Sequence, residues 1–410
     1  MNYDTLDRRR FLATATAAAL PLVGRLAVAR AAAPPDARFA FVLLRGALDG
    51  LAAVPPWGDP DYRRLRGEIA IAPPGEPGGA LPLDATFGLH PALAFLHESW
   101  RARELLVAHA VATPYRERSH FDGQDVLENG AARPHALASG WLNRALAVLP
   151  AVARSRGDAG VALGQNLPLT MRGPAPVASW SPSRLAALDD DTLDRIAELY
   201  ADDPLLSRRL ADALMADDVA RAASMDGPQR RAGARDLEVL RAAGAFLGRD
   251  GGPQVAMLDT IGWDTHANEG GAQGRLGARL GVLDAGLREM KRALGARWSS
   301  TVVVLATEFG RTAAVNGTRG TDHGTATVAF VLGGAVQGGR VLADWPGLSA
   351  RALYQQRDLT PTLDLRAILK GALGEHLGVP AVRLDTEVFP DSAAVRPATA
   401  VVRATSDSRV

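Results

Sequence analysis

The chain has 410 residues, which is enough for one large α/β domain with an insertion or for two domains, and we expect one. Its 46 basic and 45 acidic residues leave a formal net charge of +1, so no whole-chain field indicates nucleic acid or an anionic membrane as a partner. The chain has no cysteine, which excludes disulfides, thiolate metal sites and cysteine nucleophiles, so any metal must be held by His, Asp and Glu.

The first 34 residues have the pattern of an export signal. Arg8 and Arg9 precede Phe11, a weakly apolar run covers residues 13–24, and small residues follow it. This order is typical of a secretory signal, and the paired arginines indicate the twin-arginine route for folded proteins. The apolar run is too short to span a bilayer core of roughly 30 Å. We therefore expect the twin-arginine translocation machinery as a partner, a periplasmic or secreted location, and no stable membrane span after signal removal.

The mature chain opens with a continuous strand-like run at residues 38–45, and the glycine-flanked Asp49 follows it. An acid in a turn after the first strand of an α/β enzyme is well placed to be a metal ligand or a base. The alternative is that Asp49 is a turn residue.

A second buried strand is predicted at residues 105–111, with a polar stretch after it that contains Ser119 and His120. Ser119 has the features of a helix N-cap, with Asp122 three residues on as in a capping box. The same position would aim the Ser119 hydroxyl at the crevice beyond the strand ends, where a helix N-terminus favours an anion. Both interpretations of Ser119 stay open on sequence alone.

The middle of the chain contributes less chemistry. Short strands are predicted at residues 161–169 and 177–180, and the pattern at about 190–250 is mostly helical. We interpret this stretch as a helical insertion that covers one face of the sheet.

A strand at residues 255–258 returns the chain to the sheet, and Asp264 and His266 follow it two residues apart in a loop. The pair can face one ion, or the acid can orient the imidazole. A helix at 276–296 connects this loop to the next strand.

Residues 301–305 form an apolar run typical of a strand buried on both faces. Glu308 and Arg311 come directly after it, and a glycine-punctuated loop then delivers Asp322 and His323. Loops beyond the carboxyl ends of strands form the ligand crevice of open α/β sheets, so these groups indicate a site. The alternative is an ion pair between Glu308 and Arg311, with the other two side chains bonded to the loop backbone. Further on, a helix is predicted at 360–373, and the composition beyond about residue 392 predicts a disordered tail.

Six separated motifs occur in order along the mature chain. The motifs lie at residues 44–51, 118–122, 262–266, 308–312, 321–324 and 338–348. With the leader, they resemble the bacterial family called domain of unknown function 1501, and the resemblance covers nearly the whole mature chain.

The resemblance implies a fold and a set of roles. The family is grouped with the alkaline phosphatase and sulfatase superfamily, which implies a three-layer α/β/α sandwich with a mainly parallel central sheet and metals at the strand ends. Ser119 takes the place of the nucleophile. The implied metal ligands are Asp49 after the first strand, Asp264 and His266 after a later strand, Glu308 in place of an Asp, and His323 as the distal histidine.

The acids and histidines are numerous enough for one or two divalent ions, with zinc, calcium and manganese as candidates. Such ions would activate Ser119 or a bound water, and Arg311, Arg116 or Arg118 would hold the anionic ester. The full set comprises Asp49, Asp264, Glu308, Asp322, His120, His266 and His323.

The first functional hypothesis is a secreted metal-dependent hydrolase of phosphate or sulfate esters, acting on a small molecule or a polymer. The competing hypothesis is a non-catalytic envelope protein that uses the same scaffold to bind a polymer or a partner protein. A third is a metal-free esterase built on Ser119 and His120, and it is the weakest because adjacent residues at a helix start seldom face each other.

Overall fold

The structure, a computed structural model, describes residues 36–149, 159–182, 190–223 and 233–404. These residues belong to the unit Ala33–Val410, whose architecture is given below. The predicted export signal at residues 1–34 lies outside the described residues. Among the described helices, none is both long and apolar enough to cross a membrane.

A nine-stranded sheet lies at the centre of this unit, in the order β10-β4-β9-β8-β1-β7-β5-β6, with β11 also paired to β4. Among the described strands of this sheet, β9 alone runs antiparallel to its neighbours β4 and β8, and the other pairs are parallel. The predicted mainly parallel α/β sheet is confirmed. The strands are β1 Arg38–Arg45, β4 Leu105–Ala112, β5 Gly160–Leu163, β6 Val177–Trp180, β7 Val255–Ile261, β8 Thr301–Ala306, β9 Thr327–Leu332, β10 Arg340–Leu342 and β11 Leu363–Asp364. A separate hairpin pairs β2 Leu81–Pro82 with β3 Gly88–Leu89.

The central strands are mostly apolar because helices cover both faces of the sheet. Successive side chains of a strand point to opposite faces, so β1 supplies two different hydrophobic clusters. Ala40, Val42 and Leu44 belong to one cluster, and Phe39, Phe41 and Leu43 belong to the other.

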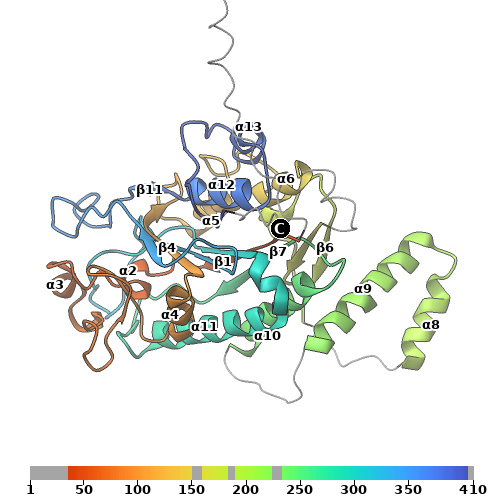
Figure 1. Ribbon diagram of the computed structural model, residues 1–410, viewed down its shortest axis with the longest axis horizontal. Helices are drawn as coiled ribbons and strands as arrows, with labels where there is room; N and C mark the ends of the chain where they lie inside the picture. The colour runs from red at the N-terminus through yellow and green to blue at the C-terminus, as the bar shows by residue number, and fades with distance from the viewer. Residues whose placement is uncertain (1–35, 150–158, 183–189, 224–232, 405–410) are drawn as a thin grey trace, which may run out of the picture. The chain divides into compact units, whose positions relative to one another are not determined.

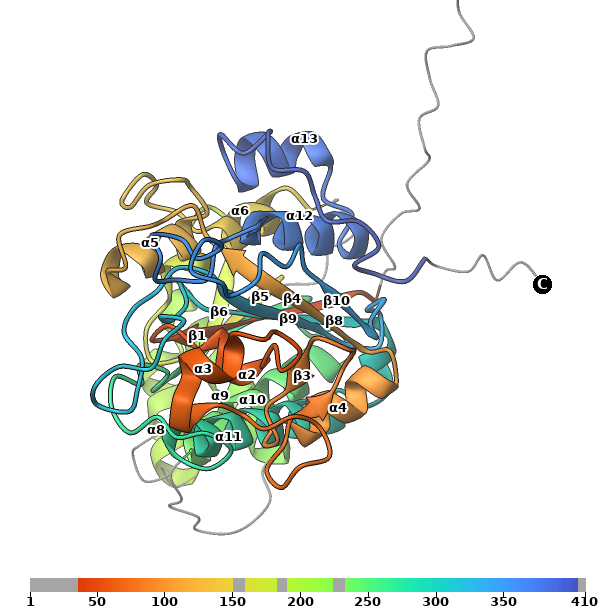
Figure 2. The ribbon, with the colours of Figure 1, turned by 90° about the vertical axis from the view of Figure 1, so that its left-hand side faces the viewer.

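Helices form a layer on each face, as Figures 1 and 2 show. One face packs against α4 Ala94–Arg101, α10 Ala234–Gly248 and α11 Arg275–Leu294. The other packs against α5 His120–Asn129, α6 Trp141–Ala147 and α12 Leu365–His376. The shorter helical elements are α2 Gly50–Ala53, α3 Tyr62–Arg66, α13 Ala381–Arg383, the 3₁₀ turns η1 Gly67–Ile69, η2 Leu169–Met171 and η3 Gly295–Ser300, and the π turn η4 Leu384–Val388.

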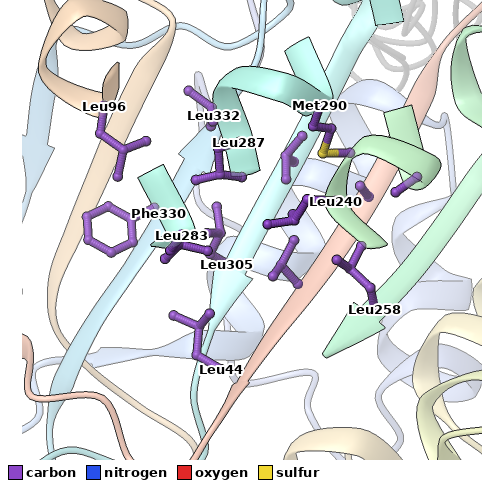
Figure 3. Close-up of a cluster of buried hydrophobic side chains, with 14 of the residues drawn as sticks. Leu44, Leu96, Leu240, Leu258, Leu283, Leu287, Met290, Leu305, Phe330 and Leu332 are labelled. Carbon is purple, nitrogen blue, oxygen red and sulfur yellow. The ribbon is translucent and has the colours of Figure 1, made fainter. Parts of the chain in front are cut away.

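The core beneath the first face is made of long aliphatic side chains that interdigitate between the layers (Figure 3). Leu240 of α10 and Leu287 and Met290 of α11 are buried, as are Leu258 of β7 and Leu305 of β8. Burying one such side chain contributes roughly 1.5–3 kcal/mol. This packing fixes the strands whose ends carry the site.

The predicted insertion at about 190–250 contains α8 Asp190–Tyr200, α9 Pro204–Ala223 and α10. The helices α8 and α9 lie on the β6 side of the sheet (Figure 1). In contrast, α10 packs along α11 within the helical layer, because its buried side chains belong to the main core.

The carboxyl-terminal part differs from the sequence prediction. The prediction of a disordered tail from residue 392 is wrong for residues 392–404: Ser392 and Val401 are buried, and Val402 forms a bridge with Val336. The alanine-rich, proline-containing stretch at residues 392–404 has no large apolar side chain beyond its valines to signal order, yet Val401 and Val402 anchor it against the core. The nearby helix α12 begins at Leu365, not at 360, because Asp364 caps it by accepting from the Arg366 N–H.

Candidate metal centre

The candidate site lies at one edge of the sheet because of how the strands run. β7 and β8 are both parallel to β1, so Asp264 and Glu308, which follow them, leave the sheet at the same edge. Because β9 is antiparallel, it begins at that edge, and His323 lies just before it. His120 is the first residue of α5, the helix that follows β4. Four segments distant in sequence therefore deliver their polar side chains to one place.

Three imidazole rings converge on the carboxylate of Asp264. Its Oδ1 lies 3.0 Å from Nε2 of His266 and 3.4 Å from Nε2 of His323, and its Oδ2 lies 3.5 Å from Nε2 of His120. The Nε2 atoms of His266 and His323 are 3.0 Å apart. His120, Asp264 and His323 offer ligand atoms within 4.8 Å of one another, and this is the group found among the described residues that could hold a metal ion.

The Nδ1 atoms of the three rings face acceptors outside the site. These contacts orient the Nε2 atoms toward Asp264. Nδ1 of His120 lies 2.8 Å from Oε1 of Glu308, and Nδ1 of His323 lies 2.9 Å from the carbonyl oxygen of Arg118. A carbonyl or an ionised carboxylate only accepts, so each Nδ1 must donate, and the neutral rings carry their lone pairs on Nε2. Nδ1 of His266 faces Oδ1 of Asp322 at 3.5 Å in a similar way. Outer partners of this kind orient metal-binding histidines.

Glu308 is buried and surrounded by donors. Its Oε1 accepts from the N–H of Gly46 at 2.9 Å, from Gln124 at 3.0 Å and from His120, and its Oε2 lies 2.8 Å from the hydroxyl of Thr307. Burial alone would raise the pKa of Glu308, but these hydrogen bonds outweigh it and the pKa lies below its usual value. Glu308 is therefore an anion that holds the His120 ring in place from behind. The family resemblance implied that Glu308 itself would be a metal ligand.

The neighbours of the three inner side chains shift their pKa values in different directions. The hydrogen bond to Glu308 raises the pKa of His120, and burial opposes this only in part. Burial and the neighbouring His120 lower the pKa of His323, so its Nε2 lone pair stays available. Burial favours neutral Asp264, but Arg311 lowers the pKa of this carboxyl overall. Within the described residues, Nε2 of His120 is a buried nitrogen that makes no hydrogen bond.

Arg311 is buried and fully engaged by the protein. Its Nη1 donates to Oδ1 of Asp264 at 2.5 Å, its Nε donates to the hydroxyl of Thr321 at 3.1 Å, and its Nη2 donates to the Thr321 carbonyl. The predicted ion pair between Arg311 and Glu308 does not form, because Asp264 takes the guanidinium. Arg311 orients Asp264, whereas the sequence suggested that it would hold an ester anion.

Comparison with known proteins places this chain in a family. A family model described as "Protein of unknown function (DUF1501)" matches residues 98–387. The chain belongs to this family. No curated protein matches the DUF1501 sequence described here.

Several solved structures are similar to this DUF1501 protein at low sequence identity. A 4S-sulfatase from a glycosaminoglycan locus of Bacteroides thetaiotaomicron is 11% identical, with 88% of this chain and 75% of that chain covered and a TM-score of 0.38. A lipoteichoic acid synthase from Listeria monocytogenes is 9% identical, with 86% and 76% covered and a TM-score of 0.33. A phosphonate monoester hydrolase of Agrobacterium radiobacter is 11% identical, with 84% and 74% covered and a TM-score of 0.33.

The backbone of Arg118 in the DUF1501 protein adopts a strained conformation at the site. Its φ of 63° lies in the left-handed region, which residues other than glycine seldom adopt. This conformation accompanies the carbonyl contact to His323, and the Arg118 side chain is anchored at 2.8 Å to the buried carboxylate of Asp358. Local strain held by surrounding contacts is typical of functional positions.

Asp49 has a structural role in place of the expected metal-binding one. Its Oδ1 accepts from the N–H groups of Leu51 and Ala52 and so caps α2, and its Oδ2 pairs with Arg66. Asp49 is 1% exposed and Arg66 is 0% exposed. Both carboxylate oxygens are thus occupied by protein donors, which agrees with the turn interpretation of Asp49.

Glu269 was not identified from the sequence, yet it links the loop that carries Asp264 to the loop that carries His323. Its Oε2 accepts from the hydroxyls of Thr265 at 3.1 Å and Thr321 at 2.7 Å, and its Oε1 lies 3.3 Å from Arg66. Burial and then the charge of Asp49 raise the pKa of Glu269 to about 8. Because Thr321 in turn accepts from Arg311, Glu269 supports Asp264 indirectly. Glu269 lies in a glycine-rich loop, and nothing in the local sequence indicates that it links the two loops.

Ser119 occupies the predicted N-cap position of α5, but the predicted capping box is wrong. In the part of the chain that the structure describes, its side chain makes no capping hydrogen bond. Asp122 instead lies 3.4 Å from the hydroxyl of Tyr115, which itself accepts from the Ser119 N–H at 3.2 Å. The Ser119 side chain contacts the phenol of Tyr115, beside His120, and does not cap the helix.

Gly46 allows the first loop to pass close to the site. A Cβ at this position would lie 2.9 Å from the backbone nitrogen of Asp264, and φ is 118°. Both the contact and the left-handed backbone require glycine. Any side chain here would displace the segment that carries Asp264.

Proposed function

We propose that this DUF1501 protein is an exported, metal-dependent hydrolase of phosphate or sulfate esters. The observation that supports the metal is the convergence of the Nε2 atoms of His120, His266 and His323 on the Asp264 carboxylate. The buried Nε2 of His120 points toward this carboxylate without a hydrogen bond, and buried polar atoms without a partner call for an explanation. A cation held between the rings and Asp264 explains it.

Zinc is the ion that the donor set favours among zinc, calcium and manganese. Three imidazole nitrogens and one carboxylate match zinc, whereas calcium takes six to eight oxygen ligands and manganese also prefers oxygen. When bound, a zinc ion supplies Lewis-acid polarisation and activates an oxygen nucleophile. One group of ligands among the described residues favours a single ion.

The protein's own groups have distinct roles in this proposal. Ser119 supplies the attacking hydroxyl, since the side chain is not used as a helix cap. The N–H groups of the first turn of α5 bind the oxygens of the ester, as helix N-termini bind phosphate. Arg311 keeps Asp264 ionised and fixed, and Glu308 and the Arg118 carbonyl hold two rings in place.

Two substitutions test the proposal. His323→Ala is expected to lower the metal content and the hydrolysis of phosphate or sulfate esters together, because a metal ligand is lost. Ser119→Ala is expected to retain the metal and lose turnover, because only the attacking oxygen is deleted. Metal content is measured by elemental analysis and hydrolysis with chromogenic esters from pH 5 to 9. His97→Ala is the matched control, since this histidine lies on α4 and its ring contacts the Pro82 carbonyl.

Each outcome separates the proposed function from its competitors. Full activity in Ser119→Ala with the metal retained would leave water as the nucleophile. Metal binding without hydrolysis of either ester class would favour the non-catalytic role, in which the scaffold binds a polymer or partner protein. Hydrolysis by a protein that binds no metal would overturn the metal proposal and favour an esterase based on Ser119 and His120.

Export is a separate part of the proposal and rests on the leader sequence. Replacing Arg8 and Arg9 with Lys is expected to block periplasmic accumulation while the mature domain still folds. Arg25→Lys is the control, because it lies after the apolar run. Normal periplasmic accumulation of the Arg8/Arg9 variant would rule out the twin-arginine route.

A further inference from the structure

Two large apolar side chains are exposed beside the candidate metal centre. Phe121 is 88% exposed and directly follows His120, and Ile261 is 67% exposed and lies three residues before Asp264. The other large hydrophobic side chains that are exposed among the described residues lie on α8, α9 and α13: Leu199, Leu205, Leu206, Leu214, Met215 and Val382. The pair at the site is therefore separate from the remaining exposed apolar surface.

Contacts with Arg45 place Phe121 and Ile261 on the same side of the site. Gln124 and Glu128 lie three and seven residues after Phe121 and share its side of α5. Both accept from Nη1 of Arg45, at 2.9 and 2.7 Å. Arg45 is in turn the direct register partner of Ile261 in the neighbouring strand. Phe121 and Ile261 thus flank Arg45 from the helix and from the strand.

The surface between these two side chains is polar but electrically compensated. Nε of Arg45 donates to Oδ2 of Asp259 at 2.5 Å, and Nη1 pairs with Glu128. The Arg45 side chain is 19% exposed and that of Asp259 is 35% exposed. Because two carboxylates face one guanidinium, this surface does not attract a second anion. The anionic group of an ester would therefore bind at the histidines, and its uncharged organic group would lie on the surface around Arg45.

His120 and Phe121 are neighbours on α5, but their side chains point in different directions. The His120 ring faces Glu308 and stacks on Phe309 with centroids 5.1 Å apart. Successive helix residues diverge by about 100°, which turns Phe121 away from this contact and toward solvent. Phe121 is thus free to contact an organic group that extends outward from an ester bound near His120.

We propose that Phe121 and Ile261 form an apolar subsite that binds the organic group of the ester, a group with a flat apolar face about the size of a phenyl ring. The inference rests on the proposed function for the position of the charged end. Covering a largely exposed Phe side chain removes apolar surface from water, and an aromatic face adds ring stacking. The subsite makes the enzyme selective for aryl-sized esters over methyl esters.

Phosphonates that are not hydrolysed test the subsite by binding alone. The affinities of phenylphosphonate and methylphosphonate are measured by calorimetry for the full mature chain supplied with zinc. We expect the wild type to prefer phenylphosphonate by about tenfold, and Phe121→Ala to reduce this preference about fivefold, since about 1 kcal/mol of apolar contact is lost. Methylphosphonate affinity is expected to stay constant. Ile261→Ala should act in the same direction, and Val382→Ala on α13 is the matched exposed control.

The outcomes distinguish this inference from the proposed function. An unchanged preference in Phe121→Ala, or no binding of either phosphonate, overturns the subsite even if esters are hydrolysed. A preference lost in Phe121→Ala supports the subsite even if no ester is turned over, a result that would defeat the proposed hydrolase alone. Self-association of the wild type that Phe121→Ala abolishes, with the phosphonate ratio unchanged, would overturn the subsite and assign Phe121 to a protein interface.

Discussion

The role of Glu308 can be tested with a substitution that removes its charge and keeps its shape. In Glu308→Gln, the amide oxygen can take the position of Oε1 and accept from Gly46, Gln124 and His120. The amide NH₂ then faces Thr307, whose hydroxyl can donate to the Leu44 carbonyl at 2.6 Å and accept from the new amide. The variant is therefore expected to fold, and its main change is the lost negative charge behind His120.

The size of the effect follows from the bond between Glu308 and His120. A hydrogen bond to a charged group contributes about 1.5–3 kcal/mol and a neutral one about 1 kcal/mol, so the bond weakens by roughly 1–2 kcal/mol. This corresponds to a loss of zinc affinity of about 5- to 30-fold, which overlaps the 10- to 100-fold range of substitutions behind metal ligands. The pKa of His120 should fall as well, because the bond to Glu308 is what raises it.

Competition with a fluorescent zinc chelator measures the affinity, and titration of the ring by NMR in the metal-free protein follows His120. Glu98→Gln is the control, because it removes an exposed carboxylate that pairs with Arg288. Affinity within twofold of the wild type would refute the idea that Glu308 orients His120. A loss far beyond 100-fold would show that Glu308 is itself a ligand, as the family resemblance implied.

Three further predictions concern the groups around the site. Asp49→Asn should lower the free energy of unfolding in urea by about 3–5 kcal/mol, because it removes the closer of the two carboxylates that face the buried Arg66, while zinc affinity stays within about threefold; a large loss of zinc affinity with full stability would restore Asp49 as a ligand. The raised pKa of Glu269 means that the metal-free folded state holds this proton up to about pH 8, so the Glu269 contribution to stability is full below about pH 4.5 and declines as the pH rises to 8. Glu269→Gln should therefore flatten the pH dependence of the unfolding free energy between pH 5 and 8, and an unchanged slope would contradict the assignment. Gly46→Ala should reduce zinc affinity by displacing the Asp264 segment, and wild-type affinity in that variant would show that the loop moves aside freely.

Much of the scaffold was readable from local sequence. The apolar runs at 38–45 and 301–305 predicted β1 and most of β8, because a strand covered on both faces is apolar at nearly every position between its ends. The helix predicted at 276–296 corresponds to α11, whose apolar residues recur at helical spacing. Short-range signals also located the loops after the strands, where polar residues collect. Fold class and the approximate position of the site follow from these signals.

The sequence by itself determined which residues reach the edge of the sheet, and only the tertiary structure decided what each one does there. Asp49 and Glu308 both follow a buried strand, but Arg66 occupies the first carboxylate and His120 contacts the second. These partners lie 17 and 188 residues away in the chain. His323 reaches the site because β9 is antiparallel and begins at the edge where the parallel strands end. A carboxylate becomes a cap, a support or a ligand according to the donors that the fold brings to it, and spacing along the chain does not encode those distant donors.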